Sequence, residues 1–413
     1  MTGEEAERWL LSLELFGMRF GLDRMRRLMT ALGSPERRFE SIHVVGTNGK
    51  SSTTRMIAAI LASHGLRTGA YLSPHLVSFG ERIRIGDRDL APDLFAAAVA
   101  RAARAVALVD RSLEEGDHVT QFEALTAAAY SELARQGVQV AVIEAGLGGR
   151  FDATNVIPSK VQVLTGVGLE HTRWLGPTLR DIAGEKLDVV QPGATLVLGA
   201  GLADEVLEVA ESVAAQRGAR IVQAGTDPGV PVGADGVFQR RNFALARAAA
   251  EAFLGSLDER AVLRAAREVR VPGRLERIAS DPLTLLDGAH NPDGIRALAE
   301  SLPDLVAGHD RLVAVISVLD DKDAAGMLAT LLPACDAAVF CACHNPRALP
   351  PPTLHSLSRQ LHGPPGEVVA DPHLALARAR ELAGPRGVVI ATGSLYLIGD
   401  LLAGAQRARA SRM

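Results

Sequence analysis

Short runs of apolar residues alternate with longer segments of helical periodicity along most of the chain. The apolar runs have the length of buried strands, and the segments between them close at glycine or proline. Strands connected by helices in this way form mainly parallel sheets with helices on both faces. The predicted strands are IHVVG (42–46), VQVAVIEAG (138–146), VQVLTGVG (161–168), ATLVLG (194–199), LTLLDGAH (283–290), LVAVISVL (312–319), AAVFCAC (337–343) and GVVIATG (387–393).

Amphipathic stretches between these runs, such as TTRMIAAILASHG (53–65) and PDGIRALAESLPDLV (292–306), predict helices. Two further helical segments, 240–254 and 258–269, precede VPGRLERI, after which a second series of strands and helices begins. We therefore expect an α/β protein of two domains. Residues 1–271 would form a larger N-terminal domain with a mainly parallel sheet, and residues 272–413 a smaller C-terminal α/β domain. DPGVPVGADG (227–236) is typical of a surface loop.

The chain has 413 residues and a formal net charge of −4. A balance so close to neutral gives no sign of nucleic acid or membrane as a partner. No apolar run reaches the roughly 20 residues of a membrane helix. The N-terminal stretch MTGEEAERWLLSLELFGMRFGLDRMRR alternates charged and apolar residues in helical fashion and lacks the layout of a signal peptide. We expect a cytoplasmic protein.

The chain has three cysteines, Cys335, Cys341 and Cys343. An odd count in a long chain argues against a disulfide framework. The sequence CACH (341–344) contains residue types that bind zinc. However, AAVFCAC is typical of an apolar strand, in which alternate residues point to opposite faces. We therefore expect no metal at the cysteines.

The stretch IHVVGTNGKSSTT carries a glycine-rich turn between a predicted strand and a predicted helix. Backbone N–H groups at the start of a helix favour an anion. Lys50 adds a full positive charge, and Ser51 or Ser52 can offer a hydroxyl to magnesium on the phosphates. Gly46 and Gly49 are separated by two residues, so this is a shortened variant of the Walker pattern. The strand before it and the helix after it favour a nucleotide site over a solvated turn.

Three further polar clusters follow predicted strands, at the edge where open α/β sheets bind ligands. Alone, each could be a solvated strand end or a helix cap. Their joint position favours a site in which carboxylate, imidazole and hydroxyl groups hold magnesium with nucleotide phosphates. The clusters are Glu144 with Arg150 and Asp152, Glu170 with His171, and Ser73 with His75.

Two other positions stay open on pattern alone. Lys186, on a predicted helix, has the default interpretation of a surface lysine. Asp287, His290 and Asn291 follow a buried strand, and this turn could bind a ligand or simply connect the strand to the next helix.

Taken together, these stretches resemble the folylpolyglutamate synthase and dihydrofolate synthase family of the Mur ligase superfamily. The resemblance extends from about residue 21 to residue 400 in the family's order. The matching motifs are HVVGTNGKSS, YLSPHLVSFGERIRI, TQFEALTAAAY, EAGLGGRFDATN, GLEHTRWLGPTLRDIAGEK, QRRNFALA, VPGRLERI, DGAHNPDG, SVLDDKD and GSLYLIGD.

The resemblance implies an ATP-dependent amide ligase. It also implies that residues 1–271 form a P-loop-type ATPase domain and residues 272–413 a smaller Rossmann-like α/β domain. The γ-phosphate of ATP would pass to a carboxylate, and the amine of L-glutamate would attack the acyl phosphate, with release of ADP and phosphate. The acceptor would be dihydropteroate, the glutamate tail of a reduced folate, or both; we favour both. The expected substrates are therefore small molecules, and a monomer is the default.

The resemblance also implies roles for individual residues. Glu144, His171 and Lys186 would be catalytic, with Lys186 carbamylated into a carboxylate-like group. Two magnesium ions would be held through Ser52, Ser73, Glu144 and His171. ATP would contact Asn48, Gly49, Lys50, Ser51, Ser52, Thr53, Asn242, Arg274, Asp287 and His290. Folate would contact Gly21, Leu22, Arg82, Thr120, Gln121, Phe122, Glu123, Phe151, Asp152 and Ala153. As an ionised carboxylate, Asp152 could accept bonds from the pterin ring.

Two residues depart from the family's usual pattern. Ser51 follows the loop lysine where glycine is usual, which leaves open whether Ser51 or Ser52 reaches magnesium. Glu170 stands where aspartate is usual and could shift His171 or the second metal. Two alternative functions are a Mur-type peptide ligase for a nucleotide-linked cell-wall precursor, which Ser51 slightly favours, and a regulatory ATP-binding protein without ligase chemistry.

Overall fold

The computed structural model describes residues 1–14 and 21–403 and divides into two compact units. The first unit contains residues 1–232 and 241–269. The second contains Gly233–Arg240 and the chain from Arg270 onward. A single cut at residue 271 differs from this division at Gly233–Arg240, which groups with the second unit. Residues 15–20 of the N-terminal helical stretch lie outside the described residues.

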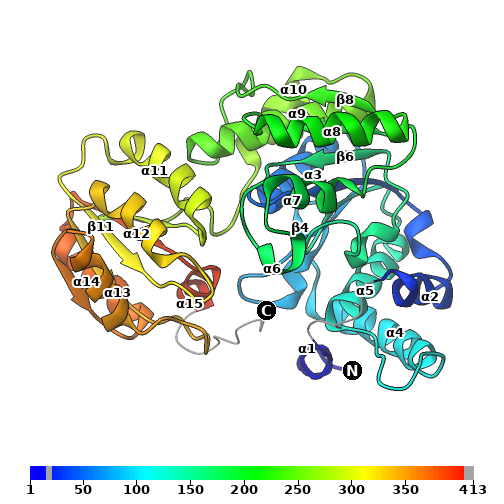
Figure 1. Ribbon diagram of the computed structural model, residues 1–413, viewed down its shortest axis with the longest axis horizontal. Helices are drawn as coiled ribbons and strands as arrows, with labels where there is room; N and C mark the ends of the chain where they lie inside the picture. The colour runs from blue at the N-terminus through cyan, green and yellow to red at the C-terminus, as the bar shows by residue number, and fades with distance from the viewer. Residues whose placement is uncertain (15–20, 404–413) are drawn as a thin grey trace. The chain divides into compact units, whose positions relative to one another are not determined.

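The first unit is built on an eight-stranded sheet of order β4-β3-β2-β5-β1-β6-β7-β8 (Figure 1). The pairings of β3 with β2 and with β4 are antiparallel, and all others in this sheet are parallel. The strands are β1 (Glu40–Val45), β2 (Thr68–Tyr71), β3 (Ile83–Ile85), β4 (Arg88–Asp89), β5 (Val140–Glu144), β6 (Val161–Leu164), β7 (Thr195–Leu198) and β8 (Arg220–Gln223).

Helices cover both faces of this sheet. Helix α3 packs on β1, β2 and β5, and α10 packs on α3. On the other face, α5 shares a buried cluster with Tyr71, Ala141 and Ile143. The helices are α1 (Gly3–Ser12), α2 (Asp23–Ala31), α3 (Lys50–Ser63), α4 (Pro92–Asp110), α5 (Gln121–Arg135), α6 (Thr172–Leu175), α7 (Leu179–Leu187), α8 (Asp204–Arg217), α9 (Val237–Leu254) and α10 (Glu259–Glu268), with 3₁₀ turns η1 (Pro35–Arg37), η2 (Phe79–Arg82) and η3 (Ala153–Val156). The first turn of α9, residues 237–240, groups with the second unit.

The second unit has a six-stranded sheet of order β13-β12-β11-β14-β10-β9, parallel except for β9. Its strands are β9 (Glu276–Ser280), β10 (Leu283–Leu286), β11 (Leu312–Ile316), β12 (Ala337–Phe340), β13 (Gly366–Val368) and β14 (Val388–Thr392). Its helices are α11 (Pro292–Val306), α12 (Ala324–Leu331), α13 (Pro351–Gln360), α14 (Pro372–Ala383) and α15 (Leu395–Ala403), with η4 (Leu332–Ala334).

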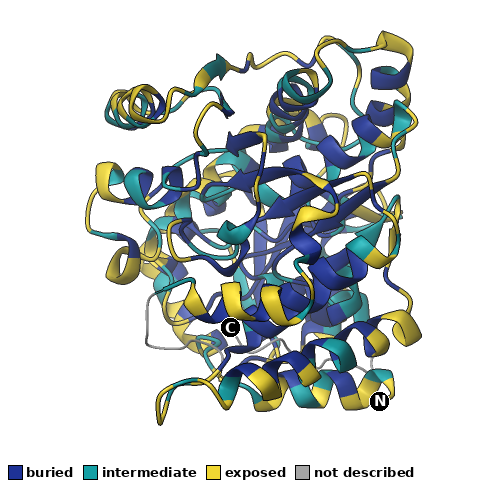
Figure 2. Cartoon of the chain, turned by 90° about the vertical axis from the view of Figure 1, so that its right-hand side faces the viewer, coloured by how far each residue is buried: buried dark blue, intermediate teal, exposed yellow. Residues whose placement is uncertain are grey.

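The predicted α/β class with mainly parallel sheets is confirmed, and each strand named from the sequence is present. Central strands such as β5 and β11 are buried along their whole length, which explains their continuous apolar sequences. Figure 2 shows interior strands in dark blue and helices that are dark blue on one side and yellow on the other. In the described part of the chain, no helix is long and apolar enough to cross a membrane.

The predicted strand AAVFCAC is shorter than expected. Strand β12 ends at Phe340, so Cys341 and Cys343 follow the strand instead of alternating along it. Both thiols are buried, and burial raises their pKa values. They are therefore packed as small apolar side chains.

Candidate active site

The glycine-rich loop follows β1 and leads directly into α3. Gly46 and Gly49 have φ of +148° and +85°, which other residues rarely adopt. The ammonium group of Lys50 folds back on the loop and donates to the carbonyls of Gly46 and Thr47, both at 3.0 Å. Gly49 is the N-cap of α3, and no side chain caps this helix. The positive end of α3 therefore has no carboxylate or hydroxyl cap of its own.

The loop is held in shape by the segment after β6. The Thr165 hydroxyl donates to the Asn48 carbonyl at 2.6 Å, and the Thr47 backbone N–H donates to the Gly166 carbonyl at 2.8 Å. An added Cβ on Gly46 would overlap the Thr165 side chain, so this contact requires glycine. Thr165 was not among the predicted site residues, and its only signal in the sequence is its position at the end of a strand.

Asn242 of α9 lies beside the same loop. A Cβ on Gly49 would be 2.7 Å from the Asn242 side-chain oxygen. This predicted nucleotide contact is therefore adjacent to Gly49, although about 190 residues separate them in the sequence.

Glu144 is the last residue of β5, and its side chain is buried. Because alternate strand residues face opposite sides, Ile143 packs toward α5 and Glu144 points toward α3. Its Oε1 accepts a hydrogen bond from the Ser51 hydroxyl at 2.8 Å, and its Oε2 accepts one from the Ser73 backbone N–H at 3.0 Å. The carboxylate thus joins the first turn of α3 to the segment after β2.

The oxygen groups around Glu144 suit a magnesium ion. Ser73 is 5% exposed, and its hydroxyl oxygen is buried with no hydrogen-bond partner among the described residues. Magnesium in nucleotide sites commonly uses one or two carboxylates together with phosphates and water. A carboxylate beside an unpaired buried hydroxyl fits that chemistry.

His171 occupies a different kind of position. It is exposed, has φ of +53° and precedes the short helix α6. Over residues 1–14 and 21–403, no three histidine, cysteine, aspartate or glutamate side chains gather closely enough to hold a metal. A metal shell here would therefore depend on hydroxyl and phosphate oxygens as well as Glu144.

Lys186 is buried near the end of α7, with 4% exposure, so it is not a surface lysine. Its ammonium nitrogen donates to the Gly46 carbonyl at 2.9 Å, across 140 residues of sequence. Burial, and next the nearby charge of Lys50, lowers the pKa of Lys186 to about 7. A substantial fraction of this amine is therefore neutral and nucleophilic near neutral pH.

Asp152 is held by a buried chain of hydrogen bonds. Its Oδ2 accepts from the Leu147 backbone N–H at 2.8 Å, and its Oδ1 accepts from both the backbone N–H and the hydroxyl of Thr154. Because the Thr154 hydroxyl proton is used by Asp152, Nε2 of His43 must donate to that hydroxyl, at 2.8 Å. Burial lowers the pKa of His43 to about 3, so this ring is neutral.

Burial raises the pKa of Asp152, while its hydrogen bonds act in the opposite direction. His43 and Thr154 fix the orientation of this carboxylate, and neither was a predicted site residue. Their interaction is long-range, because it joins β1 to η3.

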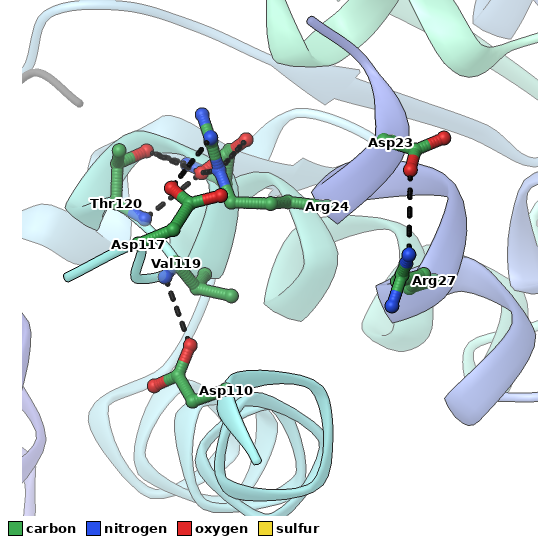
Figure 3. Close-up of polar contacts among 8 residues, drawn as sticks. Asp23, Arg24, Arg27, Asp110, Asp117, Val119 and Thr120 are labelled. Carbon is green, nitrogen blue, oxygen red and sulfur yellow. Dashed lines mark hydrogen bonds and ion pairs between the residues drawn. The ribbon is translucent and has the colours of Figure 1, made fainter. Parts of the chain in front are cut away.

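Thr120 and Glu123 form a capping box at the start of α5. Figure 3 shows Thr120 close to Arg24 and Asp117. The Glu123 carboxylate accepts from the Thr120 backbone N–H and hydroxyl, both at 2.9 Å. It also pairs with Arg24 of α2 at 3.1 Å, and Arg24 bonds Asp117 at 3.0 Å. These polar groups hold α5 and α2 together, so the two predicted folate contacts also have a structural role.

The residues between them differ in position. The Gln121 side chain donates to the Leu10 carbonyl at 2.9 Å. The Phe122 ring instead lies against Gly146, where a Cβ would come within 2.6 Å of the ring. Its centroid is 6.1 Å from that of Tyr71. Phe122 is therefore next to the segment that follows Glu144.

A cavity of about 1260 Å³ lies on the first unit and is lined in part by Gly21, Leu22 and Phe151, three of the predicted folate contacts. Phe39, Met29 and Arg150 also line it. Asp152, Ala153 and Thr120–Glu123 are not among its lining residues. The structure therefore groups only part of the predicted set around this cavity.

Arg82 is buried in η2, and its Nε donates to Nδ1 of His75 at 2.9 Å. The His75 ring packs on Phe79 with centroids 4.4 Å apart. Burial, and next the charge of Arg82, lowers the pKa of His75 well below its usual value. His75 is therefore a neutral acceptor for Arg82.

In the second unit, Asp287 follows β10 and is buried. Its carboxylate accepts from the backbone N–H groups of Leu275 at 3.0 Å and Ala289 at 2.9 Å. The Arg274 guanidinium lies against Gly288, and Nδ1 of His290 is 2.8 Å from the Gly288 carbonyl oxygen. The three predicted nucleotide contacts Arg274, Asp287 and His290 thus gather around one turn.

Comparison with known proteins supports the sequence resemblance. Residues 273–395 match the family described as Mur ligase, glutamate ligase domain. The dihydrofolate synthase/folylpolyglutamate synthase of Mycobacterium tuberculosis is 37% identical over 387 residues, covering 83% of this chain and 78% of that protein. The chain belongs to the dihydrofolate synthase/folylpolyglutamate synthase family.

Solved structures of this family share the fold. Mycobacterium tuberculosis folylpolyglutamate synthase complexed with ADP has a TM-score of 0.88 at 33% identity, covering 98% of this chain and 99% of that one. Escherichia coli FolC in complex with DHPP and ADP has a TM-score of 0.85 at 27% identity, covering 97% of each chain. None of the relatives named here is a cell-wall ligase or a regulatory protein.

Proposed function

We propose that this chain joins L-glutamate in amide linkage both to dihydropteroate and to the glutamate tail of reduced folates, using ATP. The observation that carries the proposal is the buried Lys186 bonded to Gly46 of the phosphate loop. Burying a lysine at this position costs stability that an apolar residue would not cost. A buried lysine with a pKa of about 7 beside the loop therefore indicates a functional role. The named relatives of this family supply the substrate class.

The reaction proceeds in two steps. An oxygen of the acceptor carboxylate attacks the γ-phosphorus of ATP, which breaks the bond to the bridging oxygen and releases ADP. The neutral amine of L-glutamate then attacks the carbonyl carbon of the acyl phosphate. The tetrahedral intermediate loses phosphate and a proton and leaves the amide.

The phosphate loop binds and orients the triphosphate in this proposal. Backbone N–H groups at the uncapped start of α3 and the charge of Lys50 stabilise the phosphate oxygens. The remaining nucleotide contacts are Asn48, Gly49, Ser51, Ser52 and Thr53 of the loop, with Asn242, Arg274, Asp287 and His290.

Two magnesium ions would be held by Ser52, Ser73, Glu144 and His171. When bound, they would neutralise the charge that develops on the transferring phosphoryl group. The Ser51 hydroxyl is used by Glu144, and the adjacent Ser52 is buried in the same turn of α3. The bond from Ser51 to Glu144 favours Ser52 as the ligand. Glu170 keeps the negative charge of the usual aspartate beside His171.

Carbamylation of Lys186 is what the family resemblance implies, and a neutral amine at this position would permit it. The Nζ lone pair would attack the carbon of CO₂, so that an N–C bond forms and one C=O π bond opens to give a carboxylate oxygen. One proton leaves the nitrogen to solvent. The product carries a negative charge in place of a positive one, as a group near magnesium requires.

The pterin ring would be bound by the residues that include Asp152 and Phe122. The other proposed folate contacts are Gly21, Leu22, Arg82, Thr120, Gln121, Glu123, Phe151 and Ala153.

Residues 1–271 would supply ATP and pterin binding, and residues 272–413 the glutamate-ligase part. We also propose that the protein acts as a cytoplasmic monomer without nucleic acid or membrane partners.

The test is phosphate release from ATP and magnesium with L-glutamate, comparing dihydropteroate, tetrahydrofolate and no acceptor. The wild type is expected to release phosphate with either acceptor and not without one. Lys186→Ala is expected to lose at least about 100-fold in rate, as for removal of a preorganised electrostatic group. Release without any pterin, or an unchanged rate in Lys186→Ala, would overturn the proposed function.

The carbamate has its own measurement. Protein equilibrated with ¹³C-bicarbonate is expected to show one carbamate carbon resonance that Lys186→Ala lacks. Identical spectra for the two proteins would remove the modification from the proposal and leave the ligase assignment to the phosphate assay.

A further inference from the structure

Glu144 is held by donors from two separate elements. Its Oε1 accepts from the Ser51 hydroxyl of α3 at 2.8 Å, and its Oε2 accepts from the Ser73 backbone N–H at 3.0 Å. A glutamate side chain has three rotatable bonds, and fixing one oxygen leaves the carboxylate able to turn. With a donor on each oxygen, its plane is fixed as well.

The Ser51 side chain makes no other hydrogen bond in the part of the chain that the structure describes. It lies in the first turn of α3, yet it makes no capping bond to the helix backbone. Its single hydroxyl proton goes to Glu144. Replacing it by glycine would therefore remove the Ser51 hydroxyl that donates to Oε1 of Glu144.

The second observation is the Ser73 hydroxyl. Ser73 is only 5% exposed, and its hydroxyl oxygen has no hydrogen-bond partner among the described residues. Its own backbone N–H already binds Glu144. A buried unpaired hydroxyl is costly to keep, and a cation shared with the adjacent carboxylate would satisfy it.

We propose that Ser51 is a positioning residue that orients the Glu144 carboxylate for a divalent cation bound with the nucleotide. The proposal rests on the proposed ATP-dependent function. It separates the roles of two adjacent serines: Ser51 binds Glu144, and Ser52 is available to the cation. Groups that orient a metal ligand usually change metal affinity by about 10- to 100-fold when removed.

The experiment measures Mn²⁺ binding without turnover. Mn²⁺ is titrated into protein holding stoichiometric AMPPNP, free Mn²⁺ is followed by electron paramagnetic resonance, and the titration of AMPPNP alone is subtracted. Ser51→Ala and Ser51→Gly are each expected to bind Mn²⁺ about 10-fold more weakly than wild type. Ser51→Thr, which keeps a hydroxyl, is expected to restore most of the affinity.

The control is Ser63→Ala at the other end of the same helix, for which Mn²⁺ affinity is expected to stay at the wild-type value. Thermal unfolding of every variant identifies a folding defect, and Ser51→Gly keeps the test valid if Ser51→Ala does not fold. Wild-type affinity in Ser51→Ala or Ser51→Gly would overturn the positioning role alone. Absence of protein-dependent Mn²⁺ binding in the wild type would overturn the proposed metal site and this inference with it.

Discussion

The turn after β1 and the turn after β10 both lead from a buried parallel strand into a helix, but they satisfy their backbone differently. At the first turn, α3 begins after Gly49 without any side-chain cap. At the second, the Asn291 side chain caps α11 by accepting from the Gly294 N–H at 2.8 Å. Asp287 accepts two more backbone N–H groups there.

The difference shows what each turn is built for. Anions bind at helix N-termini through exposed N–H groups, and a carboxylate or amide cap competes for those groups. The turn after β1 leaves that position open and adds the positive charge of Lys50. The turn after β10 uses its own side chains, so its contribution to a nucleotide would come from Arg274 and His290 instead of helix N–H groups.

The largest expected effect is on ATP affinity, at the turn after β1. Gly46→Ala would introduce a Cβ at φ of +148° that overlaps Thr165, the residue that fixes the loop. We expect a loss of ATP affinity of about 100-fold, since displacement of a binding loop by about 1 Å can have that effect. Titration calorimetry with AMPPNP and magnesium measures it.

Gly294→Ala is the matched change in the capped turn. Gly294 does not have positive φ, and its nearest neighbour to an added Cβ is the Asn291 oxygen at 3.1 Å. We expect its free energy of unfolding to change by about 1 kcal/mol or less. If Gly46→Ala bound AMPPNP as tightly as Gly294→Ala, the loop would not be the nucleotide site.

The next prediction concerns Lys186, whose ammonium nitrogen donates to Gly46 in the turn after β1. The folded-state pKa of Lys186 is about 7, against 10.5 for an ordinary lysine. Below pH 7 the amine is charged in both states, so the cost of burying the charge is fully present. Between pH 7 and 10.5 the unfolded chain holds a proton that the folded chain has lost, so stability rises with pH.

Lys186→Met measures this cost directly. In buffer free of CO₂, the variant is expected to be more stable than wild type below pH 7. The difference should shrink by at most about 1.4 kcal/mol per pH unit up to pH 10.5. Urea unfolding of both proteins from pH 6 to 10 checks it, and parallel stability curves would show that Lys186 is not buried as a neutral amine.

The smallest effect is at the capped turn. Asn291→Ala removes the cap on Gly294, which should lower the free energy of unfolding by about 1 kcal/mol. Urea unfolding checks this value, and Asn291→Asp, which can still accept the Gly294 N–H, should retain most of the stability. A loss as large in Asn291→Asp as in Asn291→Ala would mean that the cap is not the source of the effect.

Much of the fold could be predicted because local patterns determine it. The predicted helix 292–306 coincides with α11, since Pro292 starts it and its apolar face has helical spacing. The strand AAVFCAC was predicted too long, because periodicity does not show where a ladder partner ends. Strand β12 pairs with β11 only as far as Phe340.

The site was harder to predict in detail. The glycine loop was visible as a local motif, but the Ser51–Glu144 bond joins residues 93 positions apart. Pattern alone gave Lys186 the default of a surface lysine, because its contact with Gly46 depends on tertiary packing. The sequence TQFE has the spacing of a capping box, but Thr120 and Glu123 were predicted only as folate contacts.

The most direct test of the open loop is the affinity of AMPPNP with magnesium for wild type and Lys50→Ala, measured by titration calorimetry. Lys50 is the only full positive charge within residues 46–54, and its ammonium group donates to two loop carbonyls. The structure predicts at least about 10-fold weaker binding in Lys50→Ala, the value of a charge-assisted hydrogen bond to phosphate. Equal affinity in the two proteins would contradict it, because the nucleotide would then be held somewhere other than this loop.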